Sequence, residues 1–404
     1  MNQKTILLII PNLNFGGAQR VFYNLSIELS RQYRVIECVF NLDAGHEYKS
    51  GNEVLSLEVK GGTNLLSKLL KFYLRCRRLR DIKRRINPDV SISHLEGADL
   101  VNILSKTKEK TITWVHGSKW HDQNISGFLG FIRHRLLIPF AYKRADKVVT
   151  VSKAIREELI YHYGVSSNKI VAIYNYFDRE VIDAKSRAAL PSKYLSIFTH
   201  RVLIFAGRLV KQKNPRAMLT WFASYVRISR CKLVIVGDGE MRDELLELCS
   251  VLQLKTYHPW SDRVLSDEYE VYFLGFQENP FQFIRNSTVF ILPSLWEGFP
   301  MALGEAMCCG VPVVSADCPT GPVEMLAEEE PIKKIVYPYF ADYGVLLPLL
   351  TERNYECWTK GISELLYDKA ILDNYAGKSI KRAEVFSRKN NVQSIFELVD
   401  SVLL

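Results

Sequence analysis

The sequence predicts an α/β protein built from doubly wound parallel sheets in more than one domain. Continuous apolar strand patterns alternate with helical patterns from the N-terminus onward, and the alternation restarts near residue 202 after a polar segment. Unbroken apolar strands are typical of parallel sheets that helices cover on both faces. A chain of 404 residues is too long for one ordinary core, so two or three domains are expected.

The composition, with 48% hydrophobic and 24% charged residues, is that of a soluble globular protein. No apolar run reaches the length of about 18 residues that a transmembrane helix needs. The apolar run at 6–10 ends at Pro11 without a small-residue cleavage site, so we read it as a strand and expect no export. The eight cysteines lack Cys-x-x-Cys spacing, which favours reduced thiols in a cytosolic protein.

The net charge of +9 is concentrated in the first half of the chain. Residues 1–190 hold 30 Lys and Arg against 18 Asp and Glu, whereas the remainder holds 23 against 26. This asymmetry predicts an anionic surface as the partner of the first half. Nucleic acid is not expected, because the sequence lacks a recognition-helix motif, a zinc spacing and an aromatic RNA platform.

The first domain is expected to open with a strand at 5–10, a helix at 18–31 and a strand at 33–40. Gly16 and Gly17 stand where the helix opens. Glycines there permit a tight turn and let a ligand approach the backbone amides. An ordinary strand-to-helix turn is the alternative for such a pair taken alone.

Residues 65–86 combine a helical apolar period with nine Lys or Arg residues. One stripe is expected to pack on the sheet, and it consists of Leu65, Leu69, Phe72, Cys76, Leu79, Ile82 and Ile86. Further apolar residues at 66, 70, 73 and 74, together with the basic charge, predict contact with an anionic membrane surface. The segment 128–140 has the same mixture. The alternative is the solvated face of a sheet-covering helix.

Two histidines stand where strands are expected to end. His94 follows the run 90–93, and His116 follows the run 111–115 and precedes Gly117. The carboxyl ends of parallel strands form the functional edge of an open sheet, and the glycine favours His116 over His94. A structural role is the alternative for each. Strands at 147–152 and 170–175 complete the domain, and the polar segment 178–191 is read as a linker.

The second domain is expected to open with a strand at 202–209 that runs into a loop. Arg208 and Lys213 stand five residues apart across this loop, and two cations at a strand's carboxyl end suit a diphosphate. Ordinary surface charge is the alternative. A strand at 232–236 leads into the turn at 237–239, and another strand ends at Phe276.

The stretch 297–307 is expected to form a loop and a helix between strands at 288–294 and 311–314. It places Glu297 and Glu305 beside the carboxyl end of a strand, where open α/β sheets bind ligands. Gly298 and Phe299 lead into the first helical turn, whose backbone N–H groups and dipole suit a phosphate. This loop could hold a sugar, a diphosphate and a ribose.

These motifs, in their order and spacing over about residues 4–380, resemble the retaining GT-B glycosyltransferases of family 4. The resemblance implies two Rossmann-like domains facing a cleft, with the nucleotide sugar held mainly by the second. The domains expected are an acceptor-binding domain at 1–183, a linker at 184–198 and a nucleotide-sugar-binding domain at 199–375. Helices at 376–404 are expected to pack back toward the first domain.

The resemblance also implies roles for single residues. Glu305 would bind the ribose hydroxyls, Glu297 the hydroxyls of the donor sugar, and His116 the sugar near the reacting centre. The diphosphate would be neutralised by Arg208 and Lys213. The implied donor site consists of Gly16, Gly17, Arg208, Lys213, Phe276, Glu297, Gly298, Phe299, Leu303 and Glu305, and the implied catalytic set of His116, Glu297, Arg208 and Lys213.

Two residues depart from the family pattern without removing a charge that donor chemistry needs. Gln19 stands where an acidic residue is frequent, and Asn175 is followed by Tyr176 in place of proline. The chain has no Asp-x-Asp pair, so we expect transfer without a metal or other cofactor, with Arg208 and Lys213 in the cation's place. Double displacement through Glu297 and front-face substitution both stay open.

The sequence thus predicts a hexosyl- or N-acetylhexosaminyltransferase that uses a nucleotide sugar, UDP-linked or less favourably GDP-mannose. The segments 273–280 and 318–322 resemble the subgroup that builds bacterial surface polysaccharides and lipid-linked oligosaccharides. We expect a lipid-linked or glycan acceptor and peripheral attachment to the cytoplasmic face of the inner membrane. The alternatives are a nucleotide-sugar epimerase of the same fold and a non-catalytic membrane-associated scaffold.

Overall fold

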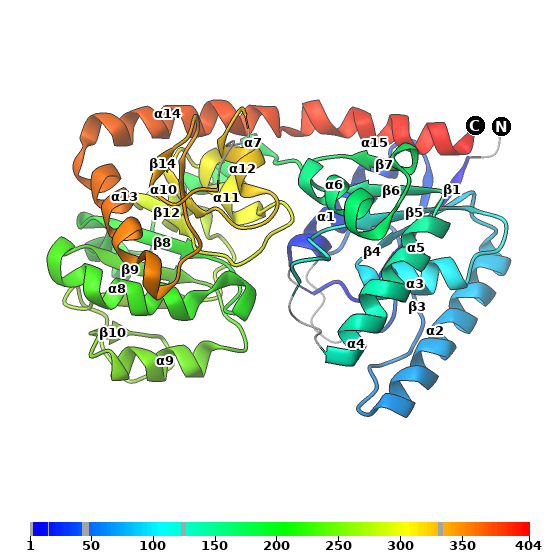
Figure 1. Cartoon of the computed structure of the whole chain (residues 1–404), viewed down its shortest axis with the longest axis horizontal. Coiled ribbons are helices and arrows are strands. Elements are labelled where there is room, and N and C mark those ends of the chain that lie inside the picture. Colours follow the sequence, from blue (N-terminus) through cyan, green and yellow to red (C-terminus); the bar gives the residue numbers. More distant parts are fainter. Residues whose placement is uncertain (1–2, 15, 43–47, 123–126, 330–333) are drawn as a thin grey trace. The chain divides into compact units, whose positions relative to one another are not determined.

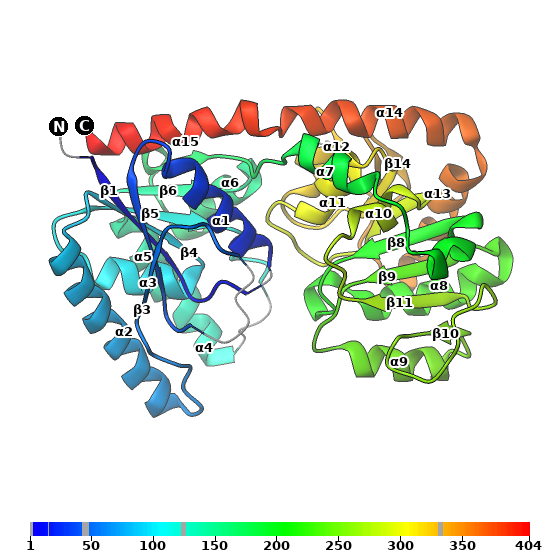
Figure 2. The ribbon, with the colours of Figure 1, turned by 180° about the vertical axis from the view of Figure 1, so that it is seen from behind.

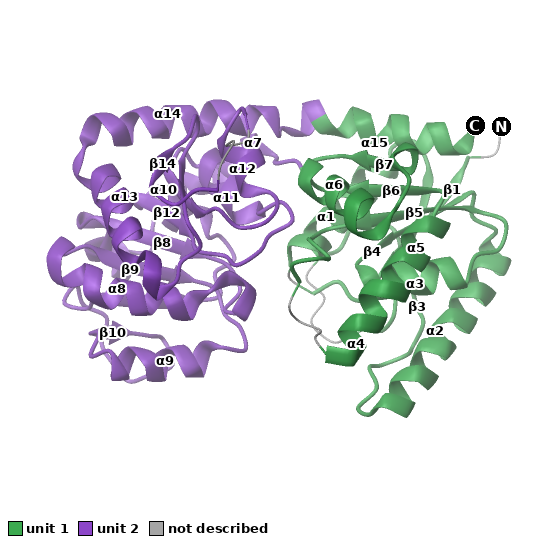
Figure 3. Cartoon of the chain, viewed as in Figure 1, with its two compact units in different colours: residues 1–175, 391–404 green, residues 176–390 purple. Residues whose placement is uncertain are grey.

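The computed structural model describes residues 3–14, 16–42, 48–122, 127–329 and 334–404, which form two compact α/β units (Figure 3). Unit 1 comprises Met1–Asn175 and Asn391–Leu404, and unit 2 comprises Tyr176–Asn390. Each unit contains its own sheet, so the prediction of two parallel-sheet α/β domains is confirmed.

Unit 1 contains a seven-stranded sheet whose strands all pair in parallel. The strand order is β3-β2-β1-β4-β5-β6-β7, so the chain reverses its direction of winding between β1 and β4. The strands are β1 (Thr5–Ile10), β2 (Arg34–Val39), β3 (Glu53–Ser56), β4 (Val90–His94), β5 (Lys110–Val115), β6 (Lys147–Thr150) and β7 (Ile170–Ala172). β1 is buried along its whole length, as its unbroken apolar run predicts.

Helices cover both faces of this sheet. α3 and α5 lie in front of the sheet in Figure 1, and α1 lies in front of its other face in Figure 2. The helices of unit 1 are α1 (Gly17–Leu29), α2 (Leu65–Ile86), α3 (Glu96–Leu104), α4 (Gly127–Ile132), the π-helical η1 (Arg133–Leu137), α5 (Ile138–Arg144), α6 (Lys153–Tyr163), the 3-10 turn η2 (Ser167–Lys169) and most of α15 (Arg388–Leu403). The Ser152 side chain caps the start of α6, because it accepts a hydrogen bond from the Ile155 amide.

Unit 2 contains an eight-stranded sheet in the order β10-β11-β9-β8-β12-β13-β15-β14. The order from β8 to β10 can be followed in Figure 2, and only the β14–β15 pair of this described sheet is antiparallel. The strands are β8 (Val202–Ala206), β9 (Lys232–Val236), β10 (Thr256–Tyr257), β11 (Val271–Gly275), β12 (Val289–Leu292), β13 (Val313–Ala316), β14 (Tyr339–Phe340) and β15 (Val345–Leu347).

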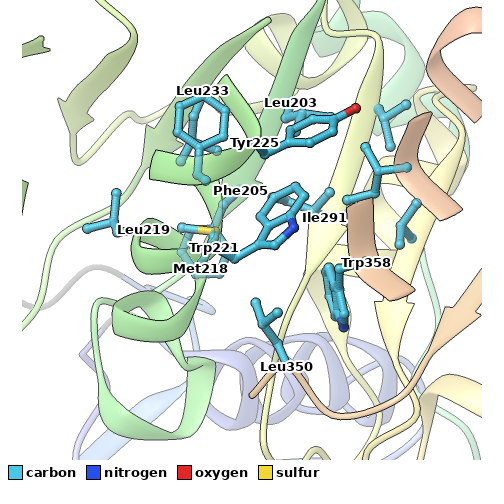
Figure 4. Packing of buried hydrophobic residues seen from close by; sticks show 14 of the residues in the cluster. Leu203, Phe205, Met218, Leu219, Trp221, Tyr225, Leu233, Ile291, Leu350 and Trp358 are labelled. Atoms are coloured by element: carbon cyan, nitrogen blue, oxygen red, sulfur yellow. The ribbon is translucent and has the colours of Figure 1, made fainter. Parts of the chain in front are cut away.

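Aromatic residues of α8 form part of the hydrophobic core of unit 2 (Figure 4). Trp221 stacks on Tyr225 with ring centroids 4.8 Å apart, and it meets Trp358 at 6.0 Å. The helices of this unit are α7 (Arg179–Ser186), η3 (Ser192–Thr199), η4 (Lys211–Lys213), α8 (Pro215–Ser229), α9 (Arg242–Val251), α10 (Phe281–Arg285), α11 (Met301–Cys308), α12 (Pro322–Leu326), η5 (Glu352–Asn354), α13 (Tyr355–Tyr367) and α14 (Lys369–Val385).

The segment read as a linker is folded and belongs to unit 2. The boundary between the units falls after Asn175, α7 lies within the polar segment 178–191, and η3 overlaps the linker expected at 184–198. α7 begins at Asp178, whose side chain accepts from the Val181 amide, and it buries Ile182. Its eight residues are too few to give a strong sequence period. At the other end of the chain, residues 391–404 belong to unit 1, where the Tyr33 hydroxyl donates to Asp400 at 2.6 Å.

α2 spans the predicted residues, but its buried stripe is shorter than predicted. Leu79 is fully buried, and Phe72, Cys76, Ile82 and Ile86 pack against the same core, whereas Leu65 and Leu69 are exposed. The first turns of α2 therefore extend beyond the core that its later turns cover. Within the described ranges, no helix combines the length and the apolar character that a membrane crossing requires.

Candidate functional site

The predicted donor-site charges of unit 2 follow two neighbouring strands. β8 pairs with β12 on one side and with β9 on the other, so the chain's winding reverses between β8 and β12. Arg208 and Lys213 follow β8, and Glu297 follows β12. Open α/β sheets bind ligands beyond the carboxyl ends of the strands at such a reversal.

The structure brings Lys213 and Glu297 into direct contact. Lys213 Nζ lies 2.6 Å from Glu297 Oε1, and the two side chains are only 14% and 6% exposed. Two hydrogen bonds of 2.8 Å join the same loops. Gln212 Nε2 donates to the Trp296 carbonyl, and the Gln212 backbone carbonyl accepts from the Leu295 amide. These contacts hold the two loops together at the strand ends.

A third loop, which follows β13, supports Glu297 from its backbone. The Glu297 amide donates to the Pro319 carbonyl at 3.3 Å, and the Thr320 hydroxyl donates to the Glu297 carbonyl. Gly321 has φ +87°, and a Cβ atom there would lie 2.8 Å from the Gly298 carbonyl oxygen. Burial, followed by the charge of Glu297, raises the pKa of the neighbouring Cys318 thiol well above its usual value, so this thiol is not an ionised nucleophile.

The glycine turn predicted at 237–239 packs closely against the loop that contains Arg208. A Cβ atom at Gly237 would lie 2.0 Å from the Gly207 carbonyl oxygen, and one at Gly239 would lie 2.5 Å from the Leu209 carbonyl oxygen. The Leu209 amide donates to the Asp238 carbonyl at 3.0 Å. The turn therefore acts as a close-packed support. Arg208 itself is exposed and forms no ion pair with another residue in the described parts of the chain.

The predicted residues around α11 have different environments. Phe299 is buried, stacked at 6.2 Å on Phe177 and edge-on to Phe386 at 5.1 Å, so it supports the loop from within the core. The Leu303 amide donates to the Pro300 carbonyl at 3.1 Å and is engaged within the first helical turn. Glu305 lies on α11 and is 8% exposed.

Gly298 and Phe276 complete the predicted donor-site residues of unit 2. Gly298, between Glu297 and Phe299, is buried. Phe276 is 52% exposed directly after β11, where Gly275 takes φ +69°. An exposed aromatic ring at the carboxyl end of a strand is available for stacking on a flat ligand.

In unit 1, His116 contacts the other predicted histidine. His94 Nδ1 lies 2.8 Å from His116 Nε2, and the two rings stack with centroids 5.0 Å apart. Burial and the positive charge of Lys119 lower the pKa of His116 to about 3. Burial and His116 lower the pKa of His94 well below its usual value. Both rings are therefore neutral at physiological pH, and one ring donates the shared hydrogen bond to the other.

The predicted glycine pair lies at the start of α1. The Gly16 carbonyl accepts from the Arg20 amide at 2.9 Å, which opens the helix. Its φ of 178° is extended, so this conformation does not by itself require glycine. Gln19, which departs from the family pattern, donates to Asn12 at 3.1 Å and connects the helix to the end of β1.

The sequence predicted the site residues but not the contacts between them. The Lys213–Glu297 pair joins residues 84 positions apart, and the His94–His116 pair joins residues 22 positions apart. The position of each histidine at a strand end was the available signal, because β4 and β5 are neighbours in the sheet.

Comparisons with known proteins agree with this architecture. Residues 15–181 match the family described as Glycosyltransferase Family 4, and residues 187–342 match the family described as Glycosyl transferases group 1. An uncharacterized glycosyltransferase of Methanocaldococcus jannaschii is 32% identical over 296 residues, which cover 68% of this chain and 67% of that protein.

Two further proteins match nearly the whole chain. The N-acetylgalactosamine-N,N'-diacetylbacillosaminyl-diphospho-undecaprenol 4-alpha-N-acetylgalactosaminyltransferase of Campylobacter jejuni is 26% identical, over 94% of this chain and 95% of that protein. The crystal structure of Anabaena HepE in complex with UDP has a TM-score of 0.73 at 19% identity and covers 98% of this chain and 100% of that one. The likeness to HepE, at 19% identity, is a likeness of fold alone.

Proposed function

Because the chain belongs to the glycosyltransferases of group 1 and family 4, we propose that it transfers a hexosyl or N-acetylhexosaminyl unit from a UDP-sugar to a lipid-linked or glycan acceptor. The acceptor belongs to bacterial surface-glycan synthesis. The transfer retains the anomeric configuration of the donor sugar. Relatives whose names carry diphospho-undecaprenol and lipopolysaccharide acceptors support this choice. The neighbouring fold solved with UDP supports the nucleotide.

The observation that carries the proposal is the pairing of Lys213 with Glu297 at the strand reversal. The same loop as Lys213 carries Arg208, which forms no ion pair with another described residue. Loss of a nucleoside diphosphate from the anomeric carbon places growing negative charge on the leaving phosphate. Arg208 and Lys213 stabilise that charge as fixed cations. Glu297 accepts hydrogen bonds from hydroxyls of the donor sugar, and Glu305 does the same for the ribose.

The contact between Lys213 and Glu297 links the two halves of the donor. The ammonium group can contact the diphosphate while it stays beside the carboxylate that binds the sugar, so phosphate and sugar recognition are coupled through one pair. His116, Gly16 and Gly17 are assigned to the same reaction on the family resemblance. A neutral His116 can donate to a sugar hydroxyl but carries no charge to the transition state.

Retention and metal independence are parts of the proposal with separate tests. Proton NMR of the first-formed product identifies its anomeric configuration, and an inverted product would contradict retention. Activity should survive an excess of EDTA over trace metal, because a chelator removes only what a metal-dependent enzyme needs. A loss that Mg²⁺ or Mn²⁺ restores would show that Arg208 and Lys213 do not replace a cation.

Peripheral membrane attachment rests on the first turns of α2. Leu65, Leu66, Leu69, Leu70 and Tyr73 are exposed there. Not all of the basic charge is available, since Arg75, Arg78 and Arg80 donate to backbone carbonyls and Lys83 pairs with Glu109 at 2.7 Å inside the unit. The basic residues of α2 that form neither an ion pair nor a side-chain hydrogen bond with another described residue are Lys68, Lys71, Arg77 and Arg85.

About four free basic residues at roughly 1 kcal/mol each still favour an anionic surface. Liposome flotation should show salt-sensitive binding that the double substitution Leu66→Ser, Leu70→Ser weakens. Ile228→Ser is the matched control, because Ile228 is equally exposed but lies on α8 of unit 2. Equal flotation of the α2 variant and the control would contradict attachment through α2.

A panel of nucleotide sugars monitored by thermal shift tests the donor. A ligand at about 100 times its Kd stabilises the folded state by about 2.7 kcal/mol, which gives a clear rise in Tm. The donor found in this way is then incubated alone. Formation of an isomer without any acceptor would identify an epimerase, and the absence of nucleotide binding would identify a non-catalytic scaffold.

A further inference from the structure

Trp120 exposes half of its side chain in the segment that follows β5 and begins with His116. The indole is 50% exposed and stacks on His162, with ring centroids 4.1 Å apart and planes within 5°. His134 and Tyr163 lie nearly perpendicular to it, with centroids 6.1 Å and 6.5 Å away. We call this exposed indole and its three ring partners the Trp120 platform.

The backbone of the platform is fixed by a buried carboxylate of α6. Glu158 accepts hydrogen bonds from the amides of Lys119 at 2.5 Å and Trp120 at 3.0 Å, and from the Ser118 hydroxyl. Burial would raise the pKa of Glu158, but the hydrogen bonds it accepts, from His121 and Ser118 first, lower it overall. The carboxylate is therefore ionised at neutral pH and holds the segment in place.

The platform's rings are also fixed to each other. His134 Nδ1 lies 2.7 Å from the Tyr163 hydroxyl, and these two rings are nearly parallel with centroids 6.0 Å apart. A large aromatic surface that is ordered before binding loses little conformational freedom when a ligand covers it. An exposed tryptophan held in this way presents a binding surface and contributes little to the core.

We propose that the Trp120 platform binds the pyranose ring of the acceptor sugar. One face of a pyranose carries C–H groups with partial positive charge, which match the negative face of an indole. The hydroxyls at the sugar's rim stay available for water and polar side chains. This inference rests on the proposed function, because it names where the acceptor of that reaction binds in unit 1.

The position of Trp120 in the chain supports an acceptor rather than a lipid surface. Trp120 lies four positions after His116, so their Cα atoms lie at most about 14 Å apart. The platform's other rings are His134, His162 and Tyr163, all with polar atoms that suit hydroxyls. A tryptophan that only anchored the protein to lipid would not need a stacked imidazole or a fixed backbone.

The test uses the full-length protein and soluble sugar probes. The probes are short-chain lipid diphosphates that carry α-linked N-acetylglucosamine, N-acetylgalactosamine or galactose. Saturation-transfer NMR with irradiation of aromatic protons reports which sugar protons contact a ring, and titration gives Kd. The variants are Trp120→Ala, Trp120→Phe and the control Tyr161→Ala, whose ring is 79% exposed on the same helix as His162.

We expect at least one probe to bind the unmodified protein with saturation on one face of its sugar ring. Trp120→Ala should raise its Kd about tenfold, Trp120→Phe about threefold, and Tyr161→Ala less than twofold. Absence of binding by all three probes, or an unchanged Kd in Trp120→Ala, would overturn the proposal. Weaker flotation of Trp120→Ala on anionic vesicles with unchanged sugar affinity would also overturn it and make Trp120 a membrane anchor.

Binding of UDP to the same samples separates this inference from the proposed function. UDP affinity should be equal in the unmodified protein and in Trp120→Ala, and an unchanged Tm shows that the variant is folded. Sugar binding without UDP binding would leave the platform standing and contradict the proposed transferase. UDP binding without sugar binding would contradict the platform and leave the proposed transferase standing.

Discussion

Lys213 Nζ lies 2.6 Å from Glu297 Oε1, so the cation predicted to bind a diphosphate contacts the carboxylate predicted to bind a sugar. The pair is nearly buried, at 14% and 6% exposure. Removing one member of a buried pair leaves an uncompensated charge, whereas removing both does not. The pair therefore contributes to stability and to ligand binding in ways that double substitution separates.

Lys213→Ala should lower the free energy of unfolding by about 3 kcal/mol, because Glu297 then remains buried without its cation. Lys213→Ala combined with Glu297→Gln should recover most of this loss. UDP affinity should fall in both variants, because both lack the ammonium group. Urea denaturation and calorimetry measure the two quantities, and additive losses of stability would show that the residues do not interact.

Gly239→Ala should destabilise the protein by about 2 kcal/mol, since its Cβ atom would lie 2.5 Å from the Leu209 carbonyl oxygen. Gly377→Ala is the matched control, because Gly377 lies inside α14 with nothing within 4 Å of a new Cβ atom. That substitution should stabilise by about 0.5 to 1 kcal/mol. A Tm change of the same sign in both variants would contradict the close-packed support of the Arg208 loop.

The ring of His116 should stay neutral between pH 5 and pH 8, because burial lowers its pKa to about 3, and the ring of His94 should be neutral at pH 7, because burial lowers its pKa well below its usual value. Carbon-detected or proton-detected NMR of labelled histidines measures this directly. The variants His94→Asn and His116→Asn assign the two signals. A titration midpoint between pH 5 and pH 8 for His116, or above pH 7 for His94, would contradict their burial as neutral groups.

The same pKa shift fixes the sign of a pH effect on stability. An unfolded histidine takes up a proton near pH 6.5, whereas folded His116 does so only near pH 3, so the free energy of unfolding falls as pH drops below 6.5. At pH 5 this loss amounts to about 2 kcal/mol for His116. His116→Asn should lose less stability between pH 7 and pH 5, and an equal loss would argue against the low pKa.

The fold class could be predicted because its signal is local. β1 and α2 were bounded correctly, since an unbroken apolar run and a helical period each repeat within a few residues. The exposure of Leu65 and Leu69 could not be predicted, because the period shows which residues share a face but not where the underlying sheet ends. α7 was missed because eight residues carry too little periodicity.

The candidate site could be predicted as a set of charges at strand ends, but its contacts could not. The pairing of Lys213 with Glu297 depends on β8 and β12 being neighbours, which is a property of strand order. Phe299 has the same sequence context as its neighbours in the loop, yet it packs on Phe177 and Phe386 inside unit 2. Such distinctions arise from tertiary packing, which no single-segment pattern contains.

Arg208 permits the most direct test of the donor site, because it is exposed and its removal should cost little stability. Isothermal titration calorimetry with UDP should give binding to the unmodified protein and at least a tenfold weaker Kd for Arg208→Ala, with Tm unchanged. An Arg208→Ala variant that binds UDP as tightly as the unmodified protein would contradict the assignment of the diphosphate to these strand ends.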